Sequence, residues 1–206
     1  MSQAPGRIGR VTRCSIRGFV GGIRLPEPDL PRFGTFCKAE AQRGRSHVIG
    51  LLYDIRVEDD ELARQVAAAD VSPEEARADQ RLNRPIPIEI EALAVGYAAD
   101  GRYHQRLPPQ PPLTMADILP LTPDEVHGFT ERLDFVWLIA AARELPVDDL
   151  LLAALHTAAE ARPLSARRDF LLQAGGACAR LMAQDLNRLD QLMRQLGAVA
   201  TGGQAV

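Results

Sequence analysis

Residues 86–107 read IPIEIEALAVGYAADGRYHQRL, and this stretch decides which kind of fold the chain forms. Its first apolar residues alternate with proline or glutamate, as in a strand with one buried face: Ile86, Ile88 and Ile90. The apolar phase then shifts by one position: Leu93, Val95 and Tyr97. Because a strand changes its buried face only through an extra residue, we predict a β-bulge near Glu91–Ala92. Asp100-Gly101 is a typical hairpin turn, and residues 102–107 are the predicted return strand.

Three further strand candidates lie upstream, over residues 8–23, 33–41 and 47–57. The first contains three glycines, at positions 18, 21 and 22, which favour a bend or a barrel corner. The third has one face of apolar side chains at a period of two: Ile49, Leu51, Tyr53, Ile55 and Val57. Several short strands with glycine bends favour a small closed barrel over an open sheet.

The proline-rich stretch LPPQPP at 107–112 marks the predicted boundary between two units, since prolines impose extended geometry and end regular elements. Residues 1–112 are predicted to form the barrel, with an acidic helical insertion at about 58–83. Residues 113–206 are predicted to form a helical domain. Its capping and proline signals indicate about three helices, over roughly 122–144, 147–161 and 165–196. The predicted fold class is therefore α+β.

The last predicted helix carries an apolar stripe with the spacing of a helix–helix seam: Met182, Leu186, Leu189, Met193 and Leu196. A stripe of this kind has to be covered, because each exposed leucine would lose about 1.5–3 kcal/mol of burial free energy. We therefore predict a helix–helix interface here, formed with the preceding helices or with a second chain. Trp137, within an apolar run, is predicted to lie in the core.

Charge is unevenly distributed along the chain, whose net charge is -3. Residues 1–56 carry ten basic and four acidic side chains, whereas residues 57–83 carry three basic and eight acidic ones. A basic barrel can bind single-stranded nucleic acid through phosphate contacts and base stacking. The candidate contacts are five N-terminal arginines: Arg7, Arg10, Arg13, Arg17 and Arg24. Phe19 is the stacking candidate within this segment.

The chemistry-bearing motifs are mostly absent from the sequence. A phosphate-binding loop of the G-x-x-x-x-G-K-[ST] type needs a lysine, and the single lysine, Lys38, stands between Cys37 and Ala39. The four histidines have no partner at metal-ligand spacing, and no serine has a G-x-S-x-G setting. We therefore predict no catalytic residue, no metal ligand and no cofactor, and expect that the protein is not an enzyme.

The cellular location is predicted from the lack of a membrane span, of a secretory signal and of a disulfide framework. No apolar run reaches the roughly 18–20 residues of a membrane span, and residues 1–13 contain no apolar core of a secretory signal. The three cysteines are odd in number and widely spaced, as is typical of buried thiols rather than of a disulfide framework: Cys14, Cys37 and Cys178. We expect a cytoplasmic protein without membrane association.

The order of several short motifs resembles the HAS-barrel, the N-terminal barrel shared by HerA-type DNA-translocating ATPases and the catalytic subunits of ATP synthase. The motifs are IGRV at 8–11, GF at 18–19, FGTF at 33–36, VIGLLYDI at 48–55, AVGY at 94–97 and LPPQPP at 107–112. The resemblance covers about residues 6–112. In that family a P-loop ATPase domain follows the barrel, whereas here about 94 mostly helical residues follow, so no catalytic residue is carried over.

The resemblance implies a barrel used for ring assembly or partner docking, in the setting of DNA processing. The expected function is that of a non-enzymatic assembly or adaptor protein, whose partner is a HerA-like ATPase or a second copy of the chain. The alternative is a barrel that binds single-stranded nucleic acid directly. A third hypothesis, an enzyme with its site at the barrel–helix junction, is disfavoured by the lack of any clustered motif.

Overall fold

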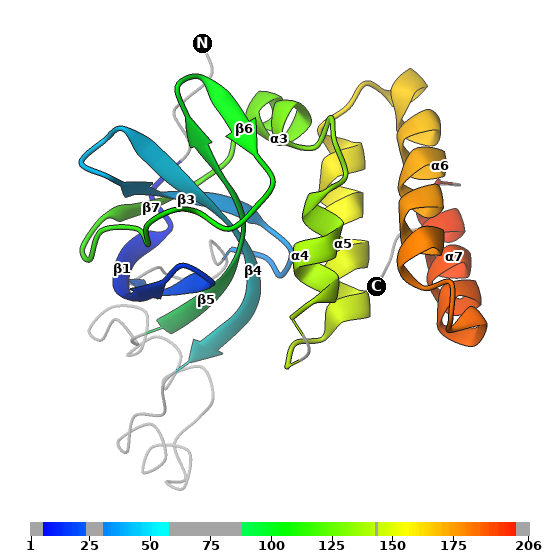
Figure 1. Ribbon diagram of the computed structural model, residues 1–206, viewed down its shortest axis with the longest axis horizontal. Coiled ribbons are helices and arrows are strands. Elements are labelled where there is room, and N and C mark those ends of the chain that lie inside the picture. The colour runs from blue at the N-terminus through cyan, green and yellow to red at the C-terminus, as the bar shows by residue number, and fades with distance from the viewer. Residues whose placement is uncertain (1–5, 24–30, 58–87, 143, 201–206) are drawn as a thin grey trace, which may run out of the picture.

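A closed β-barrel forms the N-terminal part of the computed structural model, which describes residues 6–23, 31–57, 88–142 and 144–200. Six strands close the barrel in the antiparallel order β1–β2–β5–β4–β3–β7 and back to β1, and β6 extends β5 outside the ring (Figure 1). The strands are β1 (Gly9–Ser15), β2 (Gly18–Ile23), β3 (Phe36–Ala41), β4 (Ser46–Val57), β5 (Ile88–Ala99), β6 (Arg102–His104) and β7 (Asp117–Pro120). The prediction of a small closed barrel is confirmed.

The proline-rich stretch lies inside the barrel's connectivity. Strand β7 follows it and pairs with both β1 and β3, so the barrel extends past the expected boundary at 112. The chain re-enters the barrel through two backbone hydrogen bonds, from Leu113 N–H to Glu40 O and from Met115 N–H to Val11 O, both 2.8 Å. Extended polyproline geometry carries the chain from β6 to β7 without a regular element of its own. The predicted insertion at 58–83 lies outside the described residues.

Strands β4 and β5 contain bulges, at positions that differ from the predicted one. At the level of Glu91–Ala92 the extra residue is Tyr53 of β4, and the extra residue of β5 is Val95. Strand β5 keeps its phase through Ala92 and Ala94, which face the barrel interior. Because these small residues hide the period in the sequence, the prediction of a β5 bulge near Glu91–Ala92 is wrong. The extra residue at this level belongs to β4.

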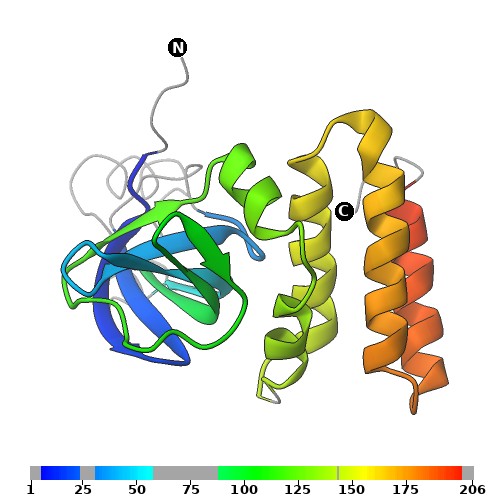
Figure 2. The same ribbon diagram turned by 45° about the horizontal axis from the view of Figure 1, so that its top comes forward.

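Two hydrophobic cores result, one inside the barrel and one between barrel and helices. The bulge at Tyr53 divides the apolar face predicted for β4: Ile49 and Leu51 face the helices, whereas Ile55 packs against the barrel interior. The larger core joins side chains of β3–β5 to those of the helices, among them Phe36, Val95, Phe129, Phe135, Leu150 and Leu155. The helices lie on one side of the barrel (Figure 2), and the shared core makes the two halves one packed body.

The helical half contains α3 (Pro123–Phe129), α4 (Phe135–Ala140), α5 (Val147–Glu160), α6 (Leu164–Leu181) and α7 (Leu186–Ala200). The helix expected over 122–144 is two short helices, because Gln105 accepts the N–H of Phe135 and donates to the carbonyl of Arg132, which fixes the break between them. The long third helix is also divided. Asp185 accepts the N–H of Arg188 at 3.1 Å and so caps the start of α7.

An ion pair between Lys38 of β3 and Glu125 of α3 links the barrel to the first helix. Both side chains are about three-quarters covered, at 25% and 30% exposed. Burial alone would raise the pKa of Glu125, but hydrogen bonds from Lys38 and Thr122 outweigh it and lower that pKa below the ordinary 4.5. Glu125 also completes the capping box of α3 with Thr122.

Glu125→Gln is expected to lower the free energy of unfolding by about 1 kcal/mol at neutral pH. A glutamine side chain can still complete the capping box, so the lost free energy of unfolding measures the contribution of the ion pair with Lys38. A lowered folded-state pKa gives stability that is present above the unfolded-state value and is lost as the pH falls through the folded-state value. Urea unfolding should therefore show a constant difference from wild type above pH 4.5 that shrinks below it. A difference that persists undiminished in acid would contradict this.

Candidate binding groove at the barrel–helix junction

A pocket of about 590 Å³ lies between the β1–β2 hairpin and the loop that follows α4. Its floor is apolar and comes from both halves of the molecule: Phe19, Val20, Ala92, Leu93, Ala141, Ala142 and Leu145. Its polar lining includes Arg13, Arg17, Tyr53 and Glu144. We call this pocket the junction groove. An apolar floor with a few polar groups at its edge is typical of binding sites.

Two exposed apolar side chains lie close in sequence to residues that line the junction groove, although neither lines it itself. Trp137 of α4 is 60% exposed, and Ile16, in the turn of the β1–β2 hairpin, is 44% exposed. The N–H of Ala141 donates to the carbonyl of Trp137 at 3.0 Å, so Trp137 lies one helical turn before a residue that lines the groove. The prediction that Trp137 lies in the core is wrong. Phe135, Val136 and Ile139 fill the buried face of this short helix, which leaves Trp137 outside.

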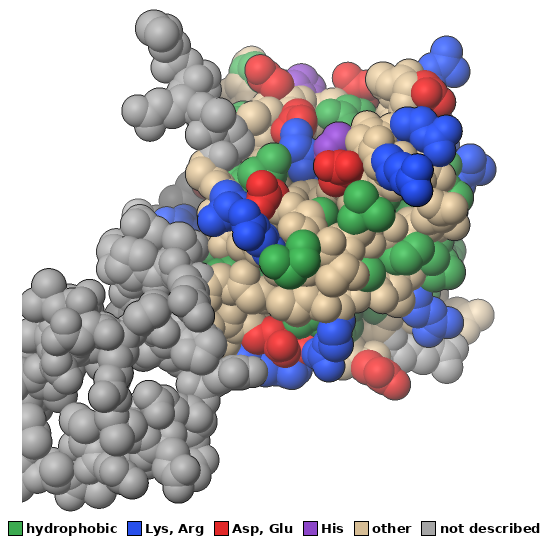
Figure 3. All heavy atoms as spheres, turned by 90° about the vertical axis from the view of Figure 1, so that its left-hand side faces the viewer, with side chains coloured by type: hydrophobic (Ala, Val, Ile, Leu, Met, Phe, Trp, Pro, Cys, Tyr) green, Lys and Arg blue, Asp and Glu red, His purple; other side chains and the backbone are tan. Residues whose placement is uncertain are grey.

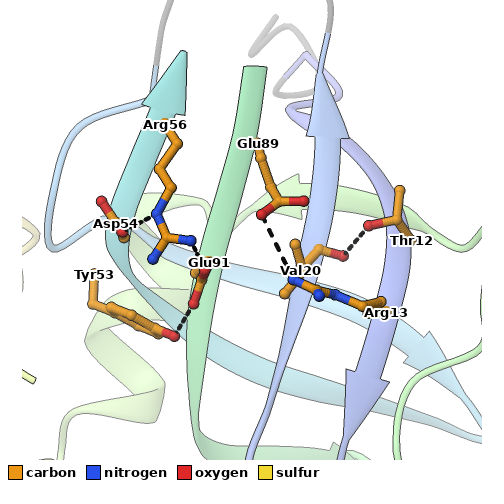
Figure 4. Close-up of polar contacts among 8 residues, drawn as sticks. All are labelled: Thr12, Arg13, Val20, Tyr53, Asp54, Arg56, Glu89 and Glu91. Atoms are coloured by element: carbon orange, nitrogen blue, oxygen red, sulfur yellow. Dashed lines mark hydrogen bonds and ion pairs between the residues drawn. The ribbon is translucent and has the colours of Figure 1, made fainter. Parts of the chain in front are cut away.

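A polar network supports the groove along β4 and β5. The Tyr53 hydroxyl donates to the Glu91 carboxylate, and Figure 4 shows both side chains on the same side of the two strands. Arg56 contacts Glu91 at 2.9 Å and Asp54 at 2.8 Å. The Glu91 side chain is only 14% exposed, and its carboxylate accepts from two donors, the charged Arg56 guanidinium and the neutral Tyr53 hydroxyl.

This network of side chains has a structural role and supplies no reactive group. Burial, then the hydrogen bond to Glu91 and its negative charge, raise the pKa of Tyr53 above its ordinary value. The phenol therefore stays protonated at neutral pH and acts as a hydrogen-bond donor rather than a base. Since Tyr53 also lines the groove, its bond to Glu91 fixes the position of the groove wall.

The predicted N-terminal arginines are partly neutralised by carboxylates. Asp117 of β7 pairs with Arg7 at 3.4 Å and with Arg10 at 3.1 Å. Arg13 approaches Glu89 at 3.6 Å, as Figure 4 shows. Within the described ranges Arg17 has no ion pair, and Arg24 lies outside them.

The side of the barrel turned away from the helices carries mixed charge. In Figure 3, Lys and Arg side chains lie beside Asp and Glu on this face, with hydrophobic side chains among them. Phosphate backbones bind to clustered positive charge. This face therefore offers charges of both signs to a partner, and Arg7 and Arg10 meet at Asp117 rather than forming an unbalanced basic cluster.

The predicted helix–helix residues are divided between a buried and an exposed group. Met182 and Leu196 are buried, and Leu189 and Met193 are partly buried against the same core. Leu186 is 71% exposed, because it begins α7 after the break at Met182–Asp185 instead of continuing the stripe. Leu192 is not part of the predicted stripe, yet it is only 2% exposed and packs in the same core as Met182 and Leu196. The cover of this stripe comes from helices of the same chain.

Reactive groups are few in the part of the chain that the structure describes. Burial raises the pKa of Cys37 to about 12 and that of Cys178 to about 11, so both remain unreactive thiols at neutral pH. No group of three or more metal-ligating side chains occurs among the described residues. None of the helices described is both long and apolar enough to cross a membrane.

Comparison with known proteins adds no family to these observations. No protein-family model matches the chain. No curated protein matches it either.

Proposed function

We propose that this protein is a non-enzymatic adaptor whose HAS-like barrel docks a partner protein at the junction groove. The observation that carries the proposal is the exposed Trp137, one helical turn before Ala141 of an apolar groove that Arg17 also lines. Tryptophan and arginine are the residues most enriched among those that dominate protein–protein binding. An exposed tryptophan presents a large apolar surface to water, so a partner that covers it gains burial free energy.

The chemistry of the groove favours an apolar partner segment that carries acidic residues. Its floor offers apolar surface to one or two large side chains. Arg13 and Arg17 at its edge outnumber Glu144, the one acidic side chain among the described lining residues. Since Arg17 has no ion pair among the described residues, a partner carboxylate can pair with it without breaking an existing contact.

The identity of the proposed partner follows from the resemblance to HAS-barrels. In the family that the motifs resemble, the barrel precedes a DNA-translocating ATPase domain, and this chain has helices in its place. We therefore assign the partner as a HerA-like ATPase of a DNA-processing assembly. The alternative, direct binding of single-stranded nucleic acid by the N-terminal arginines, loses support because Asp117 and Glu89 already engage three of them.

Trp137→Ala is expected to weaken binding to the HerA-like ATPase of the same organism by about 30-fold or more, the effect of a dominant interface residue. Arg17→Glu should also weaken it, through repulsion of the acidic segment. Isothermal titration with the purified ATPase measures both. The matched control is Arg45→Glu, because Arg45 is exposed in the turn between β3 and β4 and does not line the groove. Equal losses in all three variants would contradict docking at the groove.

A further inference from the structure

A second pocket, of about 510 Å³, lies between strand β6 and the segment that joins α3 to α4. Strand β6 pairs only with β5 in the described sheet, so the pocket opens beside a sheet edge. Its lining includes three arginines and the aromatic rings of a tyrosine and a phenylalanine: Arg102, Arg106, Arg132, Tyr103 and Phe129. No function assigned above uses these residues, and the pocket shares no lining residue with the junction groove.

The pocket is held in shape by bonds that do not involve a ligand. The Gln105 side chain donates to the Arg132 carbonyl at 2.8 Å and accepts the N–H of Phe135 at 2.9 Å. The Arg106 guanidinium donates to the Tyr97 hydroxyl at 3.1 Å through Nη2 and at 3.3 Å through Nε. These contacts fix one wall and one cation before anything binds, which lowers the entropic cost of binding.

Positive charge predominates in this pocket. Two carboxylates also line it, those of Glu131 and Asp134, but Asp134 is engaged by Arg132 at 2.5 Å. Arg102 has no ion pair in the part of the chain that the structure describes. Arg106 bonds to a neutral phenol, so its charge is not neutralised. Arginine forks match the oxygens of a phosphate better than any other side chain.

The aromatic ring of Tyr103 is available to a second planar group. Tyr103 is 39% exposed, and its inner side meets Phe129 edge to face, with ring centres 5.8 Å apart. Gly128 lies against the same ring, where a Cβ would come within 3.1 Å of Tyr103 Cε2. A ring supported in this way on one side can stack a nucleobase on the other.

We propose that this pocket binds a nucleoside phosphate, either as a free nucleotide or as one unit of a single strand. The phosphate contacts Arg102 and Arg106, and the base stacks on Tyr103. The pocket volume suits a ligand of this size, whereas inorganic phosphate alone would leave most of it empty. The proposal does not rest on docking at the junction groove, which uses other residues.

The test is equilibrium binding of a fluorescein-labelled oligothymidylate, measured by anisotropy at fixed salt, with AMP and inorganic phosphate as competitors. Arg102→Gln is expected to weaken binding about tenfold, the effect of one charged hydrogen bond. Tyr103→Leu should weaken it as well. Arg45→Gln is the matched control, because Arg45 is exposed and lines neither pocket, so the variant removes the same charge elsewhere and should change affinity by less than about twofold. Thermal melting of each variant checks that it folds.

Competition identifies the source of the ligand. Displacement of the oligonucleotide by AMP supports a free nucleotide, and binding of the oligonucleotide that AMP does not displace supports a single strand. Absence of oligonucleotide binding, together with no binding of AMP in a direct calorimetric titration, overturns the proposal. Equal weakening by Arg102→Gln and Arg45→Gln also overturns it, since only overall charge would then matter. So does unchanged affinity of folded Tyr103→Leu, or displacement by phosphate as strong as by AMP.

Discussion

Replacing Arg162 by leucine is expected to lower the free energy of unfolding by about 3–5 kcal/mol. Arg162 is only 7% exposed, and it has no carboxylate partner among the described residues. Its guanidinium instead donates to the Thr130 hydroxyl and carbonyl, both at 2.9 Å, and to the Ala158 carbonyl at 2.6 Å. It also lies 3.7 Å from the centre of the Phe170 ring.

The physical reason is that Arg162 satisfies carbonyls at two helix ends. Thr130 caps the C-terminus of α3, and Ala158 lies in the last turn of α5, where carbonyls have no partner within the helix. A cation is also favoured there by the helix dipoles. Burial lowers the pKa of Arg162, although nearby Glu131 raises it, and an arginine keeps its charge at neutral pH. Leucine would leave these buried carbonyls unpaired.

Chemical denaturation of Arg162→Leu, Arg162→Lys and a control measures this effect. Lysine keeps the charge but cannot reach three acceptors with a planar fork, so it should recover only part of the stability. The control is Arg168→Leu, because Arg168 is exposed on α6 and should cost less than about 0.5 kcal/mol. Equal stabilities of Arg162→Leu and Arg168→Leu would show that the buried bonds contribute nothing.

Gly34→Ala is expected to destabilise the protein by about 2 kcal/mol more than Gly44→Ala. Both glycines have positive φ, 78° and 81°, so both alanine variants share the cost of left-handed backbone. At Gly34, however, a Cβ would lie 2.4 Å from the Cβ of Ala153 and 3.1 Å from its backbone carbon. At Gly44 the nearest atom would be 3.8 Å away.

The difference arises because Gly34 is where the barrel meets α5. Its carbonyl accepts a hydrogen bond from Thr157 at 3.4 Å, and its N–H donates to Leu52 O at 2.8 Å. A methyl group here has to push α5 away from the barrel and open the shared core. Urea unfolding of the two variants measures the difference. A result in which both lose the same free energy would show that the junction is loosely packed.

The barrel could be predicted because its strands carry their own signals. Alternating residues, glycine bends and a hairpin turn specify strands locally, and the short strands with glycine bends favoured closure. The end of the barrel could not be predicted, because β7 is only four residues long and follows the prolines that usually end a unit. The breaks at Gln105 and Asp185 also depend on side-chain bonds that no period reveals.

The sites were harder to predict than the fold, because they join distant segments. Trp137 stands in an apolar run, and it is exposed because Phe135, Val136 and Ile139 occupy the buried face of α4. The arginines of the second pocket lie outside residues 1–56, the segment in which ten basic side chains predict a binding surface. The sequence also does not show that Asp117 neutralises Arg7 and Arg10, because β7 reaches β1 only in the folded barrel.

The adaptor proposal is tested most directly by hydrogen–deuterium exchange on the complex with the HerA-like ATPase. The account predicts that exchange slows on binding in residues 13–20 of the hairpin and in residues 137–142 and 144–145 around the end of α4, segments that contain most of the described lining residues of the junction groove. Exchange in the turn at residues 42–45 should not change. Protection confined to other parts of the barrel, or no change anywhere at saturating ATPase, would contradict the account.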